Sequence, residues 1–229
     1  MSDSLKIAII GDYNFTFNSH HATNLALDHS SAFLDLEINY YWIKIAEAVQ
    51  YKVSQFDQFD GVWIAPGPFK NLFYLSGIFR NLLELRKPVL ITGDAFKSFF
   101  EYLITQNQLN PHGEKLISDN LIQGNHFERL TITPNSALFK RLYENFSNIE
   151  LTSSRFSLYP QLIEALDGKL LDVEAYNQFE EPEIVSLKDY PFFLLCGFCP
   201  QISSTRDLPH PIVYTFLKIA TPFPLIENE

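Results

Sequence analysis

Short apolar runs alternate with amphipathic stretches through the first half of the chain. Four of the runs have the length and β-branched content of buried strands, residues 6–10, 36–43, 61–65 and 89–92. Apolar residues at helical spacing predict helices in residues 20–33, 78–85 and 96–103. Ser19 is expected to cap the first of these helices. Apolar strands that alternate with helices are typical of a parallel sheet covered on both faces.

The second half of the chain loses this regular alternation. Residues 106–125 are rich in Asn, Gln and Gly and predict a loop or lid. Beyond them, further strands are predicted in residues 126–133, 149–159, 170–176, 184–187 and 192–198, and a final helix begins near Pro211. With no internal repeat or clear linker, we expect residues 1–229 to form one α/β domain. Its central sheet is mostly parallel, with helices on both faces and additional antiparallel strands in the second half.

Composition excludes several classes of protein. The chain is 46% apolar and 19% charged, as in an ordinary globular protein, and no apolar run approaches the roughly twenty residues of a membrane span. Seventeen basic against 27 acidic side chains give a net charge of −10, which disfavours nucleic acid as a partner. Two cysteines and no visible signal peptide fit a reduced, cytoplasmic setting. No cofactor, metal or membrane partner is expected.

Candidate chemistry lies where the predicted parallel strands end, because ligands bind an open sheet beyond its carboxyl edge. Three such ends are residues 11–14, 66–69 and 92–94. The last is a tight strand-to-helix turn around Gly93, of the kind that presents a nucleophile in many α/β enzymes. The alternative is a glycine that permits the bend, followed by Asp94 as an N-terminal helix residue.

Several segments, in this order and spacing, resemble the class I glutamine amidotransferase domain at the C-terminal end of CTP synthase. The likeness to free-standing bacterial proteins related to that region is closer still. The matching segments are residues 6–14, 59–67, 87–93, 155–156, 190–193, 198–201 and 210–211. The resemblance extends from about Leu5 to Ala220 and implies a flavodoxin-like fold. No stretch resembles the amidoligase domain that makes CTP.

The resemblance also implies a damaged catalytic site. Active members of the family use a Cys–His–Glu triad, in which a thiolate attacks the glutamine amide. These three positions fall here on Gly93, Cys199 and Gln201, or on Thr92 for the nucleophile if the alignment shifts by one residue. Pro68 replaces the glycine whose N–H stabilises the oxyanion, and proline has no N–H to offer.

The predicted ligand pocket consists of Gly67, Pro68, Phe69, Asp94, His20 and Arg155. We expect Gly67, Phe69, His20 and Arg155 to converge near the end of the strand at 61–65. Arg155 would hold a carboxylate, so the expected ligand is a small anionic molecule, with a protein partner as the alternative. The alternative for Arg155 is a surface ion pair, and for His20 an exposed position at the start of a helix. A homo-oligomer is left open.

The two cysteines form a CxxC spacing at the end of a predicted strand. Positions i and i+3 of a strand face opposite sides, so Cys196 is expected in the core and Cys199 at the pocket edge, without a redox or zinc role. The sequence thus favours a catalytically degenerate amidotransferase homologue. The alternative is an enzyme with different chemistry in the same pocket, using Cys199, Asp94, His20 or Thr92. A third hypothesis is an active glutaminase with a displaced nucleophile.

Overall fold

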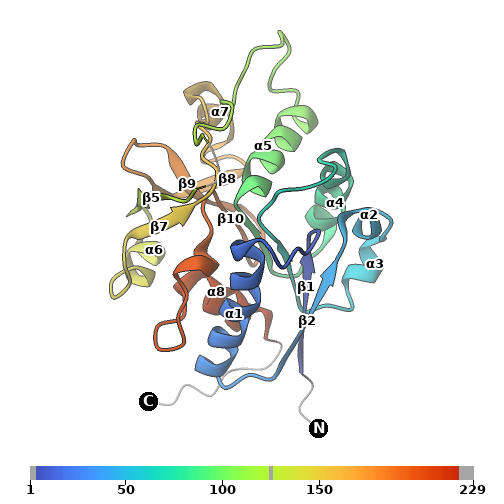
Figure 1. The fold of residues 1–229 in the computed structure, drawn as a ribbon. Helices are drawn as coiled ribbons and strands as arrows, with labels where there is room; N and C mark the ends of the chain where they lie inside the picture. The colour runs from blue at the N-terminus through green and yellow to red at the C-terminus, as the bar shows by residue number, and fades with distance from the viewer. Residues whose placement is uncertain (1–3, 124–125, 222–229) are drawn as a thin grey trace.

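An eight-stranded sheet forms the centre of the protein in the computed structural model, which describes residues 4–123 and 126–221 (Figure 1). Its strand order is β2-β1-β3-β4-β10-β9-β8-β6. The five parallel strands are β1 Leu5–Ile10, β2 Ile38–Ile43, β3 Gly61–Ile64, β4 Val89–Thr92 and β10 Phe193–Cys196. The antiparallel strands are β9 Pro182–Leu187, β8 Leu171–Tyr176 and β6 Thr133–Pro134. The predicted fold class, with antiparallel strands from the second half, is confirmed.

Helices cover both faces of this sheet because its strands are apolar on both faces. On one side, Ile7 and Ile9 of β1 pack in a cluster with residues of α1 Asn18–Phe33 and α8 Pro211–Ala220. On the other side, Ala8 and Ile10 pack with residues of α4 Phe73–Glu84 and α5 Asp94–Gln106. The alternation of side chains along a strand sends neighbouring residues to opposite faces and so creates two cores. None of the helices in the described ranges is long and apolar enough to cross a bilayer.

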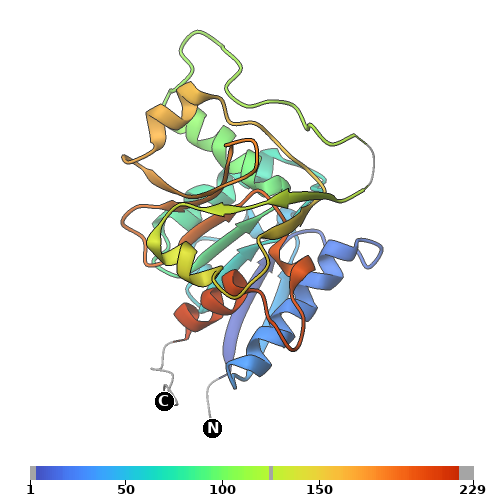
Figure 2. The same cartoon turned by 90° about the vertical axis from the view of Figure 1, so that its left-hand side faces the viewer.

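Smaller elements complete the described structure. A separate two-stranded sheet pairs β5 Glu128–Thr131 with β7 Ile149–Thr152 in antiparallel fashion. The short helices are α2 Ile45–Ala48, α3 Val53–Phe56, α6 Ala137–Leu142, α7 Pro160–Leu166 and the 3-10 helix η1 Pro200–Ser203. After α5, the chain runs as a long irregular segment over the top of the molecule (Figure 2). This segment agrees with the predicted loop at 106–125, of which residues 124–125 lie outside the described residues.

Three local predictions were wrong. Ser19 does not cap α1, since the N-cap is Phe17 and Ser19 is buried within the first turn. The strand predicted at 149–159 ends at Thr152, where Ser154 N–H donates to Thr152 Oγ1 at 3.2 Å and turns the chain. The strand predicted at 126–133 divides into β5 and β6, which belong to different sheets. Periodicity along the chain carries no information on which sheet a strand joins.

Candidate functional site

A neutral histidine forms hydrogen bonds to two of the loops at the carboxyl edge of the sheet. His20 is buried in the first turn of α1. Its Nδ1 accepts from Asn14 N–H at 3.0 Å, so the ring proton lies on Nε2, which donates to the carbonyl oxygen of Pro66 at 3.0 Å. Burial lowers the pKa of His20, with hydrogen bonds to the backbone opposing the shift. His20 is therefore neither exposed nor open to a ligand, because both nitrogens hold the loops that follow β1 and β3.

The strand-to-helix turn at Gly93 is a sharp bend at the carboxyl end of β4, which we call the elbow. Gly93 has a φ of 62°, and α5 begins at the next residue, Asp94. A Cβ at Gly93 would lie 2.8 Å from Pro66 Cβ and 3.5 Å from Cys199 Sγ. The residue predicted at the nucleophile position therefore lies between the loop after β3 and Cys199. The bend is sharp, and no side chain projects from it.

Thr92, the other residue considered for the nucleophile position, faces the core. Its hydroxyl accepts from Trp63 Nε1 at 3.0 Å and lies 3.3 Å from the carbonyl oxygen of Ile64. The side chain is completely buried. The Thr92 hydroxyl is therefore occupied by hydrogen bonds that join β4 to β3.

The other two positions that the resemblance matches to the triad are also buried. Cys199 has no exposed surface, and burial together with the charge of Asp94 raises the pKa of its thiol to about 12. The expectation that Cys199 lies at the pocket edge was wrong. Strand β10 ends at Cys196, and Cys199 N–H donates to the carbonyl oxygen of Leu151 at 3.0 Å, which holds Cys199 under β7. Gln201 is buried beside it in η1, and neither side-chain polar atom has a hydrogen-bond partner among the described residues.

A cavity of about 450 Å³, which we call the elbow pocket, opens beside Gly67 and Asp94. A Cβ on Gly67 would collide with Asp94 Oδ2, so only glycine allows this carboxylate to lie against the loop. The lining residues come from α1 and its preceding loop, the loop after β3, the start of α5 and two irregular segments: Thr16, Phe17, Asn18, Ser19, Gly67, Pro68, Asp94, Asn120, His126, Phe127, Ser153 and Ser154. Gly67, Pro68 and Asp94 are the predicted site residues that the structure brings together here.

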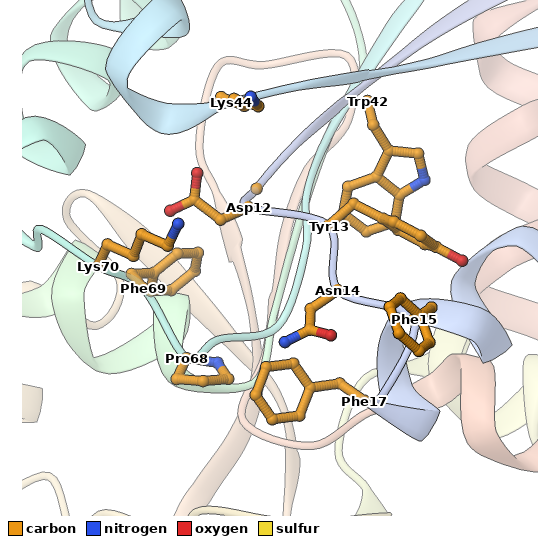
Figure 3. Close-up of a pocket in the computed structure, with 11 residues that line it drawn as sticks. Asp12, Tyr13, Asn14, Phe15, Phe17, Trp42, Lys44, Pro68, Phe69 and Lys70 are labelled. Carbon is orange, nitrogen blue, oxygen red and sulfur yellow. The ribbon is translucent and has the colours of Figure 1, made fainter.

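A second cavity of about 560 Å³, the aromatic pocket, shares Phe17 and Pro68 with the elbow pocket (Figure 3). It is lined by Gly11, Asp12, Tyr13, Asn14, Phe15, Phe17, Trp42, Lys44, Pro68, Phe69 and Lys70. Trp42 and Tyr13 meet edge to face with ring centroids 4.9 Å apart. Phe69 lines this cavity and not the elbow pocket, which separates it from Gly67 and Asp94.

Arg155 lines neither cavity. Its Nη1 lies 3.2 Å from Glu181 Oε2 and its Nε lies 3.8 Å from Glu128 Oε2. The guanidinium also stacks over the Phe179 ring at 4.6 Å from the centroid. The expected convergence of Arg155 with Gly67, Phe69 and His20 therefore differs from the structure, because two carboxylates of the same chain occupy the cation.

Sequence reasoning missed several lining residues of the elbow pocket, among them Asn120, His126, Ser153 and Ser154. They lie in irregular segments, where no periodicity marks the side that faces a cavity. The only available signal was the predicted loop at 106–125, which contains Asn120. These residues are polar but individually unremarkable, and only the approach of distant segments gives them a common cavity.

The mostly parallel sheet, its antiparallel strands and the helices on both faces give the chain the fold of a class I glutamine amidotransferase-like domain. The glutaminase domain of Trypanosoma brucei CTP synthase, solved with bound acivicin, superimposes with a TM-score of 0.76 at 17% identity, over 97% of this chain and 96% of that one. In sequence, the chain is similar to CTP synthases of Helicobacter pylori and Encephalitozoon cuniculi, with 25% and 23% identity over 94% and 92% of this chain. It spans 45% and 42% of their lengths. No protein-family model matches the chain.

Proposed function

We propose that the chain is a catalytically degenerate relative of the CTP synthase glutaminase domain, which binds a small molecule or a protein partner and releases no ammonia from glutamine. The observation that carries the proposal is the elbow at Gly93, where no side chain projects. A covalent acyl intermediate needs a nucleophile at this bend, and neither the buried Thr92 hydroxyl nor the buried Cys199 thiol can take that role.

The groups around the elbow support the same conclusion. Pro68 has no N–H to donate to an oxyanion, and loss of one such donor costs about 3 kcal/mol of transition-state stabilisation. Cys199 has a thiol pKa of about 12 and so is not a base at neutral pH, and the carboxamide of Gln201 does not ionise. The nucleophile, the base, the carboxylate that orients the base and one oxyanion donor, which glutamine hydrolysis needs, are therefore all missing.

An enzyme with different chemistry in the same pocket remains the second candidate, and the contacts favour it less. Among its four residues, Thr92 and His20 are held by hydrogen bonds within the fold, and Cys199 is buried. Only Asp94 lines the elbow pocket. No hydrogen bond joins any two of the four side chains in the described structure, whereas a nucleophile needs an adjacent base.

Ammonia release from L-glutamine tests the proposal directly. The purified protein would be assayed with and without UTP and ATP, beside an active CTP synthase as positive control. We expect no release above the buffer blank. Release above the blank would support an active glutaminase with a displaced nucleophile and would overturn the proposal. Loss of that release in Cys199→Ser or Asp94→Asn would identify the residue on which it depends.

A further inference from the structure

The elbow pocket has one carboxylate on its wall, that of Asp94, and one histidine, His126, whose Nε2 lies 3.9 Å from Glu128 Oε1. Neither lysine nor arginine is among its lining residues. The carboxylate of Asp94 forms no hydrogen bond or ion pair with any residue in the described ranges. It lies at the start of α5, where the helix dipole favours negative charge. An unpaired anion faces a cavity in a protein whose net charge of −10 attracts cations.

A second, independent group on the cavity wall also lacks a partner. Ser154 is 3% exposed and lines the elbow pocket, yet its Oγ has no hydrogen-bond partner among the described residues. A buried hydroxyl without a partner costs stability, so such a group in a cavity wall indicates where a ligand's polar atom is accommodated.

Asn120 is the third polar group of the pocket, and its side chain indicates which uncharged polar group the ligand carries. Asn120 Oδ1 already accepts from the backbone N–H groups of Ile122 and Arg155, each at 3.0 Å. Its Nδ2 is left as the donor, and a ligand meets a donor with a neutral acceptor such as a carbonyl or hydroxyl oxygen.

We infer that the elbow pocket binds a small organic cation, a primary amine that also carries a neutral carbonyl or hydroxyl group, with the ammonium held by Asp94 and Ser154. This inference rests on the proposed function, in which the pocket binds a molecule without cleaving it. The anionic ligand expected from the sequence needs a cation on the cavity wall. Arg155, the residue expected to supply it, is bound to Glu181 and Glu128 instead.

Three probes with one carbon skeleton and different charges test the inference. L-glutaminamide is a cation, L-glutamine a zwitterion and N-acetyl-L-glutamine an anion. Calorimetric titration of the full chain should give binding of L-glutaminamide that is about ten-fold or more tighter than binding of N-acetyl-L-glutamine, since a charged hydrogen bond outweighs a neutral one. The isosteric substitution Asp94→Asn should remove that advantage. Glu101→Gln, which neutralises a carboxylate of the same helix outside the pocket, should leave it unchanged.

A second measurement on the unmodified protein keeps the test decisive if Asp94→Asn does not fold. Addition of L-glutaminamide should shift the backbone amide NMR signals of Gly67, Asp94 and Ser154, with little change at Glu181. Tighter binding of the anion, no binding of any probe, or shifts centred on Glu181 would each overturn the inference. Ammonia appearing in the L-glutamine sample would instead overturn the proposed function and leave the charge preference to be judged on the other two probes.

Discussion

His210 Nε2 lies 2.8 Å from Glu150 Oε1, and neither side chain has any exposed surface. Because His210 Nδ1 accepts from Ile212 N–H at 3.2 Å, the ring proton is on Nε2 and points to the carboxylate. Tyr143 and Ser203 donate their hydroxyls to the same carboxylate, at 2.9 and 3.1 Å. Burial and the nearby Glu150 raise the Tyr143 pKa well above its usual value, so this phenol remains a donor. Three donors thus compensate a carboxylate buried where β7 meets η1 and the start of α8.

His210→Ala should destabilise the protein by about 3 kcal/mol or more, since it leaves a buried carboxylate without one of its donors and opens a cavity. Ser203→Ala removes a donor to the other oxygen of Glu150 and should cost only about 1 kcal/mol. Urea unfolding of both variants against the unmodified protein gives the two differences. Equal, small costs would mean that His210 does not support Glu150.

Acidification should weaken the fold through His20. Because burial lowers the pKa of His20 in the folded state, the unfolded chain binds its proton first as the pH falls below the ordinary value of 6.5. The free energy of unfolding should therefore decrease from pH 6.5 downward until the folded-state pKa is passed. Protonation would also place a proton on Nδ1, which now accepts from Asn14 N–H.

The matched variants for this prediction are His20→Asn and His21→Asn. We expect the first to flatten the acid limb of the stability profile and the second, at an exposed neighbouring position, to leave it in place. The profile would be measured by thermal unfolding across the pH range. An acid limb that persists unchanged in His20→Asn would assign it to other groups.

Glu183 should have the opposite dependence on pH. It is buried beside Asn177, whose Nδ2 donates to it at 2.8 Å, and burial raises its pKa to about 8. The unfolded chain loses this proton near pH 4.5 and the folded chain near pH 8, so stability falls as the pH rises between these values. Glu183→Gln keeps an acceptor for Asn177 and does not titrate. It should be the more stable form at pH 8, with an advantage that grows by about 1 kcal/mol per pH unit from 4.5.

Gly93→Ala should be strongly destabilising, and a second glycine separates its two causes. Both Gly93 and Gly113 have positive φ, 62° and 76°, but only at Gly93 would a Cβ meet an atom within 3 Å, Pro66 Cβ. Gly113→Ala should therefore cost about 1 kcal/mol from backbone strain alone, and Gly93→Ala should cost at least twice as much. Gly93→Cys carries the same strain and should not restore glutaminase activity. Equal losses of stability in the two alanine variants would show that Pro66 moves away from the added Cβ.

The sequence by itself determined the parallel half of the sheet and the bend at its centre. The runs at 61–65 and 89–92 are apolar on both faces and end in Pro-Gly or Gly-Asp, so each strand and its exit are encoded within a few consecutive residues. Gly93 needs its positive φ whichever strand lies beside it. The position of Asp94 at the start of a helix follows from the same local signal.

Only the tertiary structure decided which side chains face the cavity. Arg155 and Glu181 are 26 residues apart, and their ion pair depends on how the end of β7 lies against the turn between β8 and β9. Asn120, Asp94 and Ser154 likewise reach one pocket from three segments with no common periodicity. Local propensity acts over a few residues, whereas charge pairing and cavity lining depend on contacts between segments far apart in the chain. For that reason the sequence located the elbow correctly but wrongly placed Arg155 beside it.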